Sequence, residues 1–383
     1  MNILQVNKFY YPVMGGVETV CKQHSEFLAK KHSVTILCVQ EKFSLFTQLE
    51  IINNVKVYRC SSLGTFFSMP VSLSFVFYYI RLFLKSDLVF FHLPFPMADF
   101  VFFLTRFIKR RTKIFAVWHS DIVKQGFLKR LLKPLLNSSV YNVDKIIVTS
   151  PKLVSYSEFL KPYMLKDKIV VLPLSVNVDD VNVSANNYKG KLLGTLDNID
   201  GCFFGRLCYY KGVDVLMDAL LLAKKDGFEP RIVIAGEGEY SSLISDKIKE
   251  YSLDNVIFIN RFLDSDEKYW LLQKSKCFLF PSVERSEAFG ITQIESMSLG
   301  TPVINTNLPS GVPWVSIHRQ TGFTVDPKNP LQLYLALKEM LVNESERLSY
   351  GRAAIRRVKK DFDDHIVLKK LEFLVEGVSV DSV

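Results

Sequence analysis

The chain has 383 residues, about two to three times the usual size of one domain, which predicts two domains. Hydrophobic residues make up 48% and charged residues 23% of the sequence, so the composition excludes long disorder, a collagen-like repeat and a polytopic membrane protein. The net charge of +9 is uneven, because residues 1–190 hold 24 Lys and Arg against 12 Asp and Glu, whereas residues 191–383 hold 24 against 27. A basic N-terminal half predicts a phosphate-bearing partner, either an anionic lipid surface, a phosphorylated substrate or nucleic acid.

Positive charge peaks in 106–133, where nine basic residues face the single acid Asp121. Nearby aromatic residues suit a face that dips into lipid headgroups, although ordinary core helices explain them equally well. These residues are Phe66, Phe67, Phe75, Phe77, Tyr78, Tyr79, Phe83, Phe102, Phe103 and Phe107. Proline and charge interrupt the apolar stretches 66–84 and 88–108, so neither supplies the roughly 20 apolar residues that spanning a bilayer requires.

The six cysteines form no CxxC pair and have no histidine at zinc-site spacing, which predicts neither a disulfide scaffold nor a metal site. We expect reduced, mostly buried thiols in a cytosolic protein. The N-terminus lacks a basic segment followed by an apolar run, so residues 3–6 are predicted to form a first strand rather than part of a signal peptide.

Short apolar, β-rich runs alternate with helical periodicity along the whole chain, which predicts an α/β fold with parallel sheets covered by helices. The candidate strands are 3–6, 34–39, 55–58, 88–91, 114–117, 146–149, 169–172, 202–204, 232–235, 256–259, 278–280 and 303–305. Helices are expected over 16–31 and after Gly212, Ser241, Asp264 and Gly290. We therefore predict two Rossmann-like, doubly wound domains facing a cleft, with ligands at the carboxyl ends of strands.

The polar segment 177–200 is the best candidate linker. On this basis the predicted divisions are an N-terminal Rossmann-like domain over 1–185 and a C-terminal Rossmann-like domain over 186–365. A helix or tail over 366–383 is expected to pack back on the first domain.

The loop 205–212 lies between a predicted strand and a predicted helix. At such a position a diphosphate can meet free backbone N–H groups, and Arg206 with Lys211 would neutralise its charge. The alternative is that both residues are merely solvated loop cations.

The segment 284–295 follows a strand and opens a helix. Phe289, Gly290 and Ile291 would present their N–H groups at the positive end of that helix. Glu287 lies in the turn, and Glu295 lies about two helical turns further along. Acids near a helix start are common because they favour the dipole, which explains Glu287 but not Glu295.

Glu287 and Glu295, with seven residues between them, resemble the paired-glutamate signature of the GT-B, family 4 retaining glycosyltransferases. Gly15 and Gly16 with Glu18 resemble that family's N-terminal glycine loop, and 205–212 resembles its donor-diphosphate loop. Further matches, in family order, are 92–96, 118–121, 235–238 and 300–304. The resemblance is to the bacterial surface-polysaccharide type, called group 1.

The resemblance implies that the domain over 1–185 binds the acceptor and that the domain over 186–365 binds the nucleotide sugar. It also implies a role for each matched position. Arg206 and Lys211 would grip the donor diphosphate, Glu295 would accept the ribose hydroxyls, and His119 would lie near the transferred sugar. Gly15 and Gly16 would let the first loop approach the sugar diphosphate. The sugar and its phosphate would be held by Glu287, Ala288, Phe289, Gly290 and Ile291. For His119 a hydrogen-bonded core histidine is the alternative.

The implied reaction transfers a sugar, with retention of configuration, from a nucleotide diphosphate sugar to a glycan acceptor and needs no essential metal or other cofactor. A polyprenyl diphosphate-linked glycan at the inner face of the plasma membrane would explain the basic, Phe-rich half. In bacterial relatives this reaction serves O-antigen, capsule or exopolysaccharide assembly. Residues 173–177 and 284–285 depart from the family pattern, so the resemblance does not identify the donor of this chain.

Three other readings are weaker. Asp264 and Asp266 resemble a metal-binding Asp-x-Asp, but they precede a predicted helix and fit an N-cap better. A GT-B-like nucleotide-sugar epimerase would consume the donor without an acceptor, and the paired glutamates disfavour it. A nucleic-acid-binding protein is suggested only by the basic half, and no recognition motif accompanies it.

Overall fold

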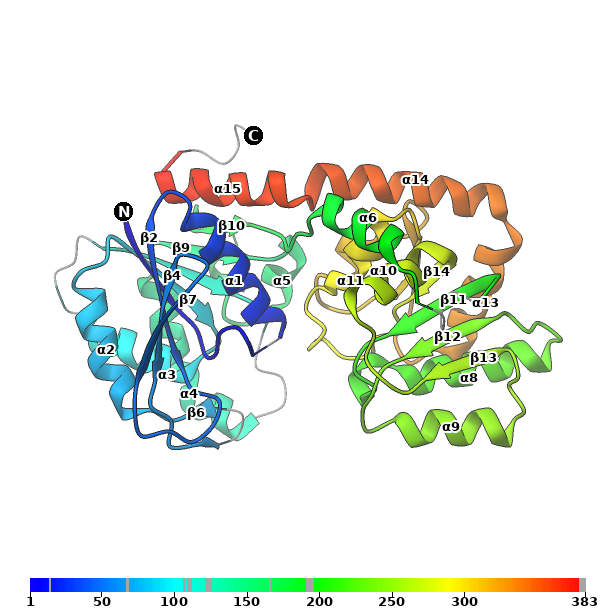
Figure 1. Cartoon of the computed structure of the whole chain (residues 1–383), viewed down its shortest axis with the longest axis horizontal. Helices are drawn as coiled ribbons and strands as arrows, with labels where there is room; N and C mark the ends of the chain where they lie inside the picture. The colour runs from blue at the N-terminus through cyan, green and yellow to red at the C-terminus, as the bar shows by residue number, and fades with distance from the viewer. Residues whose placement is uncertain are drawn as a thin grey trace. The chain divides into compact units, whose positions relative to one another are not determined.

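The computed structural model describes residues 1–13, 15–66, 69–105, 108, 112–120, 126–164, 167–190 and 196–378, without the side chains of Phe66, Met69, 126–129, 131 and 132. The chain forms two compact units, Met1–Leu172 with Leu368–Val383 and Pro173–Val367. Each unit contains one large sheet flanked by helices (Figure 1).

The sheet of the first unit has the order β10-β9-β8-β7-β1-β2-β4-β3. Its strands are β1 (Asn2–Val6), β2 (Ser33–Val39), β3 (Gln48–Ile52), β4 (Val55–Cys60), β7 (Leu88–Leu93), β8 (Lys113–Trp118), β9 (Lys145–Val148) and β10 (Ile169–Val171). All pairings are parallel except that of β3, an antiparallel edge strand on β4. The chain reverses its direction of sheet growth between β1 and β7, where ligands commonly bind in doubly wound folds.

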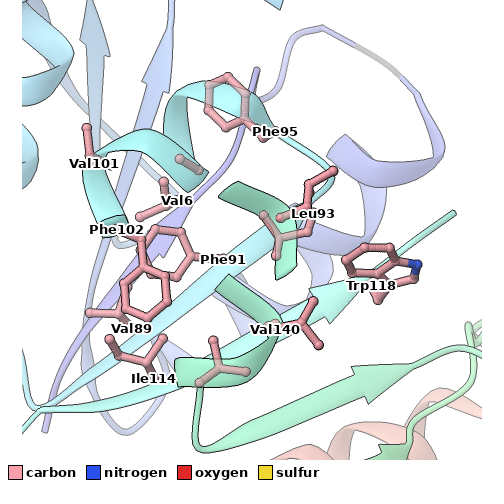
Figure 2. Close-up of a cluster of buried hydrophobic side chains, with 14 of the residues drawn as sticks. Val6, Val89, Phe91, Leu93, Phe95, Val101, Phe102, Ile114, Trp118 and Val140 are labelled. Carbon is pink, nitrogen blue, oxygen red and sulfur yellow. The ribbon is translucent and has the colours of Figure 1, made fainter. Parts of the chain in front are cut away.

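Helices and a small hairpin complete the first unit. They are α1 (Gly16–Leu28), β5 (Thr65–Phe66), β6 (Met69–Pro70), α2 (Leu73–Phe83), α3 (Pro96–Thr105), α4 (Gly126–Asn142), α5 (Pro151–Tyr156) and the 3₁₀ turn η1 (Lys161–Tyr163). Figure 2 shows part of the core, where Phe91 of β7 and Phe102 of α3 have ring centroids 5.2 Å apart. Apolar residues on successive buried strands thus fix the helices on the sheet.

The sheet of the second unit has the order β13-β12-β11-β14-β15-β16, with every pairing parallel. Its strands are β11 (Ile199–Phe204), β12 (Ile232–Ala235), β13 (Val256–Ile259), β14 (Ser275–Leu279), β15 (Val303–Thr306) and β16 (Gly322–Val325). Its helices are α6 (Val178–Asn187), η2 (Tyr209–Lys211), α8 (Val213–Lys225), α9 (Ser241–Glu250), α10 (Ser265–Lys274), α11 (Ile291–Ser298), α12 (Val312–Val315), α13 (Pro330–Val342) and α14 (Glu344–Asp361). The switch point of this sheet lies between β11 and β14.

The last helix, α15 (Asp364–Glu376), belongs to both units, because its residues from Leu368 onward group with the first unit. Within that unit Lys31 Nζ lies 2.5 Å from Glu372 Oε1, and Leu371 and Val375 are buried. The tail that we expected over 366–383 therefore corresponds to a helix whose described part groups with the first unit.

The predicted α/β class and two Rossmann-like sheets are confirmed, and every predicted strand overlaps an observed one. The linker prediction over 177–200 is wrong in part, because Asn177 caps α6 by accepting hydrogen bonds from the amides of Asp179 and Asp180. Because α6 packs on α10, the compact units divide at Leu172, before the boundary that we expected at residue 185.

Besides the two-residue strands β5 and β6, two strands were not predicted. In β3, apolar Leu49 and Ile51 alternate with polar Gln48 and Glu50, and all four side chains are exposed at the sheet edge. The other strand, β16, is only four residues long and follows a turn over 319–321. Short or exposed strands lack the buried apolar run that identified the others.

The described helices include none that is both long and apolar enough to cross a bilayer. Of the aromatic residues considered for a lipid-facing surface, Phe75, Tyr79, Phe83 and Phe102 are buried, whereas Phe77 and Phe103 are exposed. Phe67 and Phe107 lie outside the described residues. Much of the predicted basic segment lies outside the described residues, namely Arg106, Lys109, Arg110, Arg111, Asp121 and Lys124.

Candidate functional site

Two loops of the second unit meet at its switch point. The loop 205–212 leaves β11, and the loop 280–290 leaves the neighbouring strand β14. The amide of Val283 donates to the carbonyl of Tyr210 over 2.8 Å, which joins the loops directly. Gly212 has φ 67°, and a Cβ there would lie 2.0 Å from the Pro281 carbonyl oxygen. Glycine is therefore required for this close approach.

Lys211 and Glu287 form an ion pair across these loops. Lys211 Nζ lies 2.5 Å from Glu287 Oε2, and the two side chains are only 17% and 12% exposed. The Ser282 hydroxyl donates to the same oxygen over 3.4 Å, and the rings of Phe280 and Tyr210 lie 5.2 and 5.5 Å from the ammonium. The structure thus brings together two residues that the sequence placed in one site, and Lys211 is a paired rather than a free cation.

The electrostatic surroundings keep Tyr210 protonated. Burial raises the pKa of its hydroxyl, and the negative charge of Glu287 raises it further. Arg206 is exposed and forms no ion pair with the part of the chain that the structure describes. It is therefore the cation of this loop whose charge remains uncompensated.

The turn before α11 exposes its backbone amides. Gly290 caps α11 with φ 78°, and a Cβ there would lie 2.6 Å from the Phe280 ring. The amides of Phe289, Gly290 and Ile291 have no acceptor among the described residues, as is usual for the first turn of a helix. Free N–H groups at a positive helix end are suited to binding an anion.

A buried amide network, which the sequence analysis missed, fixes this turn. Gln293 Nε2 donates to the carbonyl oxygen of Phe289 over 2.9 Å, and Gln293 Oε1 accepts from Asn305 Nδ2 over 2.8 Å. Asn305 also donates to the carbonyl oxygens of Val312 and Ser316. An asparagine within the apolar run of β15 was the available signal, because a buried amide needs partners.

Glu295 lies in a second cluster, on the buried face of α11. Its Oε1 accepts from Lys268 Nζ over 2.7 Å and from the Tyr269 hydroxyl over 3.1 Å, both from α10. Its Oε2 is buried and has no partner among the described residues. Burial raises the pKa of Tyr269, and the charge of Glu295 adds to this effect. One carboxylate oxygen is therefore held in place, and the other is an unused acceptor.

The Asp-x-Asp segment is a helix cap, as the N-cap interpretation predicted. The Asp264 carboxylate accepts from the Glu267 amide over 2.9 Å, and the Glu267 carboxylate accepts from the Asp264 amide over 3.1 Å. Arg261 forms a bidentate pair with Glu267, each bond being 2.6 Å long. Asp264 and Glu267 are thus committed to structural contacts.

The predicted site residues of the first unit follow β1 and β8, the two strands that flank β7. Gly15 follows β1 and caps α1, and His119 directly follows β8. A Cβ on Gly15 would approach Glu18 Oε2 to 2.4 Å, whereas a Cβ on Gly16 would meet no atom of the described residues within 4 Å. No described residue around position 16 therefore requires a glycine there. A ligand that approaches the backbone at this position would explain the glycine.

His119 ends a chain of buried polar groups. Gln5 Oε1 lies 2.8 Å from His92 Nε2, and His92 Nδ1 lies 2.9 Å from His119 Nε2. Since an amide oxygen only accepts, His92 must carry its proton on Nε2 and accept at Nδ1. His119 then donates from Nε2, and its Nδ1 is left as an acceptor.

Both imidazoles are neutral at physiological pH. Burial lowers the pKa of His119 to about 3, with a smaller contribution from His24. Burial and the neighbouring His119 lower the pKa of His92 well below its ordinary value. His119 is thus a hydrogen-bonding group rather than a general acid at neutral pH, and Gln5 and His92 are supporting residues to which the sequence analysis assigned no role.

Comparisons with known proteins match both units. Residues 188–357 match the family model described as Glycosyl transferases group 1, and residues 14–180 match that of Glycosyltransferase Family 4. The chain is 30% identical over 374 residues to the O-antigen chain mannosyltransferase C of Escherichia coli, covering 96% of each chain. It is 32% identical over 278 residues to the D-rhamnosyltransferase WbpZ of Pseudomonas aeruginosa, covering 73% of this chain and 70% of that protein.

Solved structures share the fold. Anabaena HepE, solved in complex with UDP, superposes with a TM-score of 0.76 at 17% identity, covering 99% of this chain and 100% of that one. Sucrose-phosphate synthase from Thermosynechococcus elongatus gives a TM-score of 0.72 at 17% identity, covering 98% of each chain. These similarities confirm the predicted GT-B fold.

The hydrogen-bonded series of Gln5, His92 and His119 predicts a specific NMR result and a specific pH dependence of stability. In protein with ¹⁵N-labelled imidazoles, His92 and His119 should both carry their proton on Nε2 and should not titrate between pH 8 and pH 5. The unfolded chain takes up these protons near pH 6.5, whereas folded His119 does so only near pH 3. Stability should therefore fall as the pH drops below about 6.5.

The exposed His365 supplies an internal reference signal for this measurement. Gln5→Leu removes the acceptor that fixes the Nε2 proton of His92 and should produce a mixture of tautomers. A His119 signal that titrates near pH 6.5, or that carries its proton on Nδ1, would contradict the assignment.

Proposed function

Because this chain belongs to the group 1, family 4 glycosyltransferases, we propose that it transfers a sugar from a nucleotide diphosphate sugar to a hydroxyl of a glycan acceptor. The proposed reaction retains the anomeric configuration and needs no essential metal. The proposed acceptor is a polyprenyl diphosphate-linked glycan, used in surface polysaccharide assembly by an enzyme peripheral to the inner face of the plasma membrane. The similarity to an O-antigen mannosyltransferase and to a capsular polysaccharide glycosyltransferase supports this setting.

The observation that carries the proposal is the Lys211–Glu287 pair beside the unpaired amides of 289–291, at the switch point of the second unit. A diphosphate needs positive charge and N–H donors converging from adjacent loops. The sugar attached to it needs a hydrogen-bond acceptor close to the phosphates, and the Glu287 carboxylate can serve as that acceptor.

Charge balance at this site favours Arg206 as a principal partner of the leaving diphosphate. Glu287 already compensates Lys211, so the pair adds no net charge. As the glycosidic bond breaks, the diphosphate gathers negative charge, which Arg206, a shared Lys211 and the α11 amides would stabilise without reorganising. Lys211 would then bridge the phosphate and the carboxylate, which links donor binding to sugar positioning.

Glu295 would hold the nucleoside part of the donor. Its unpartnered Oε2 can accept hydrogen bonds from ribose hydroxyls, while Lys268 and Tyr269 keep Oε1 in position. A buried carboxylate without a compensating cation would be costly, so Lys268 also allows Glu295 to remain ionised. Lys268 and Tyr269 are thus positioning residues in this proposal.

His119 would contact the transferred sugar as a neutral group. Its Nδ1 lone pair can accept a hydrogen bond from a sugar hydroxyl, since Nε2 is committed to His92. The open space beside Gly16 would admit the sugar diphosphate to the loop that follows β1.

Replacing Glu287 should abolish turnover while leaving the fold intact. Glu287→Gln removes the charge that holds Lys211 and weakens the acceptor for the sugar, so we expect kcat to fall about a hundredfold or more. Glu284→Gln is the matched control, because Glu284 lies in the same loop but pairs with the exposed Lys328. Circular dichroism checks folding, and near-native kcat in Glu287→Gln would refute this role.

Replacing Lys268 should weaken donor binding more than it slows the chemical step. Lys268→Met leaves Glu295 uncompensated, so the KM for the donor should rise about tenfold with little change in kcat. Lys268→Arg should restore part of the loss, and Lys274→Met, at an exposed position of the same helix, is the control. If Lys268→Met and Glu295→Gln have fully additive effects, the two residues do not act as a unit.

The proposed function is tested directly with a panel of nucleotide diphosphate sugars. A cognate donor should raise the unfolding temperature as its concentration rises, and it should support transfer to a lipid-linked or synthetic glycan. NMR of the product formed in EDTA should show the same anomeric configuration as the donor. An inverted product, or activity that EDTA abolishes and a divalent ion restores, would contradict the corresponding part of the proposal.

A further inference from the structure

Helix α2 presents an uncovered apolar stripe. Its residues Leu73, Phe77, Ile80 and Leu84 repeat at intervals of three and four, so they share one helical face. Leu73 is 77% exposed, Phe77 62% and Leu84 64%. The opposite face, with Phe75, Tyr79 and Phe83, is fully buried. A helix that is apolar on both faces is expected where a second apolar medium covers the outer one.

Neighbouring segments extend the stripe. At the start of α2, the Ser74 hydroxyl accepts a hydrogen bond of 3.0 Å from the Thr47 hydroxyl, which ties the segment with the largely exposed Phe46 to this end of the helix. Helix α3 packs on α2, with the Tyr79 and Thr105 hydroxyls 3.1 Å apart, and it exposes Phe100 and Leu104. We call Phe46, Leu73, Phe77, Ile80, Leu84, Phe100 and Leu104 the apolar face.

A basic cavity adjoins the C-terminal end of this stripe. The cavity has a volume of about 260 Å³ and is lined by Lys56, Arg81 and Lys85, together with Ser33, Thr35 and Ser86, of which Ser86 already donates its hydroxyl to the Leu82 carbonyl. None of the three cations forms an ion pair with a described residue. Uncompensated cations beside hydroxyl donors match the chemistry of a phosphate group.

The cavity and the first-unit residues of the candidate site lie at opposite ends of the strands of the same sheet. Asn2 and Ser33, which begin β1 and β2, line the cavity, whereas Gly15 and His119 follow the carboxyl ends of β1 and β8. A ligand in the cavity therefore leaves the carboxyl edge of the sheet open to substrate.

We propose that the apolar face docks on an anionic lipid bilayer, with its side chains in the interface and a lipid phosphate bound between Lys56, Arg81 and Lys85. This deepens the proposed function, on which it rests for the lipid-linked acceptor, by naming the surface that meets the membrane. The charge beside the apolar face favours a bilayer over a second copy of the chain as its partner. A symmetric dimer through this face would bring the same uncompensated cations toward each other, whereas an anionic surface attracts them.

The proposal is tested by co-sedimentation of the full chain with vesicles. Wild-type protein should bind vesicles of phosphatidylcholine with phosphatidylglycerol, and binding should weaken at high salt. The Lys56→Ala, Arg81→Ala, Lys85→Ala triple variant should bind these vesicles about a hundredfold more weakly, since each cation contributes about a fivefold gain near such a surface. The double variant Phe77→Glu, Leu84→Glu should lose about tenfold or more.

Leu335→Glu is the matched control, because Leu335 is an exposed leucine on α13 of the second unit. It should bind vesicles as the wild type does. Hydrolysis of the donor without membranes should be unchanged in all variants, so a failure of docking is distinguishable from a failure of the proposed function. Wild-type protein that ignores anionic vesicles, or variants that bind like the wild type, would overturn the proposal. So would a dimer that the Phe77→Glu, Leu84→Glu variant converts to monomers.

Discussion

The ion pair between Lys211 and Glu287 joins the loops that leave β11 and β14, and the geometry of the candidate donor site depends on it. Two opposite charges that are mostly shielded from water attract more strongly than an exposed pair. They can meet at 2.5 Å only because Gly212 lets one loop reach the backbone of the other. The pair thus holds two candidate site residues in fixed positions beyond the ends of two adjacent strands.

The charge of buried polar groups is controlled differently in the two units. In the second unit Glu287 and Glu295 each face a lysine, so their charges are compensated where they lie. In the first unit no cation or acid compensates the His92–His119 pair among the described residues, and burial keeps both rings neutral. A charged donor and a neutral sugar hydroxyl need these two kinds of surroundings respectively.

Much of the fold was predictable because parallel strands covered on both faces are short, continuous apolar runs. The exposed edge strand β3 and the capped helix α6 were missed, since neither carries such a run and 177–200 is polar enough to suggest a linker. Candidate site residues that lie within one continuous segment, such as Glu287 to Ile291, could be proposed from the sequence. The contacts of Glu295 with Lys268 and Tyr269, of Gln293 with Asn305 and of His92 with Gln5 could not, because tertiary folding alone brings these residues together and no sequence spacing encodes the contact.

Helix α15 has a consequence for how the protein is made. Leu371 and Val375 supply apolar cover to the first unit, and Glu372 pairs with Lys31, yet these residues are synthesised after the whole second unit. A nascent chain that has only reached residue 172 therefore exposes apolar surface that these side chains later bury. The first unit is thus completed only after the second unit has been synthesised, and chaperones have this interval in which to bind it.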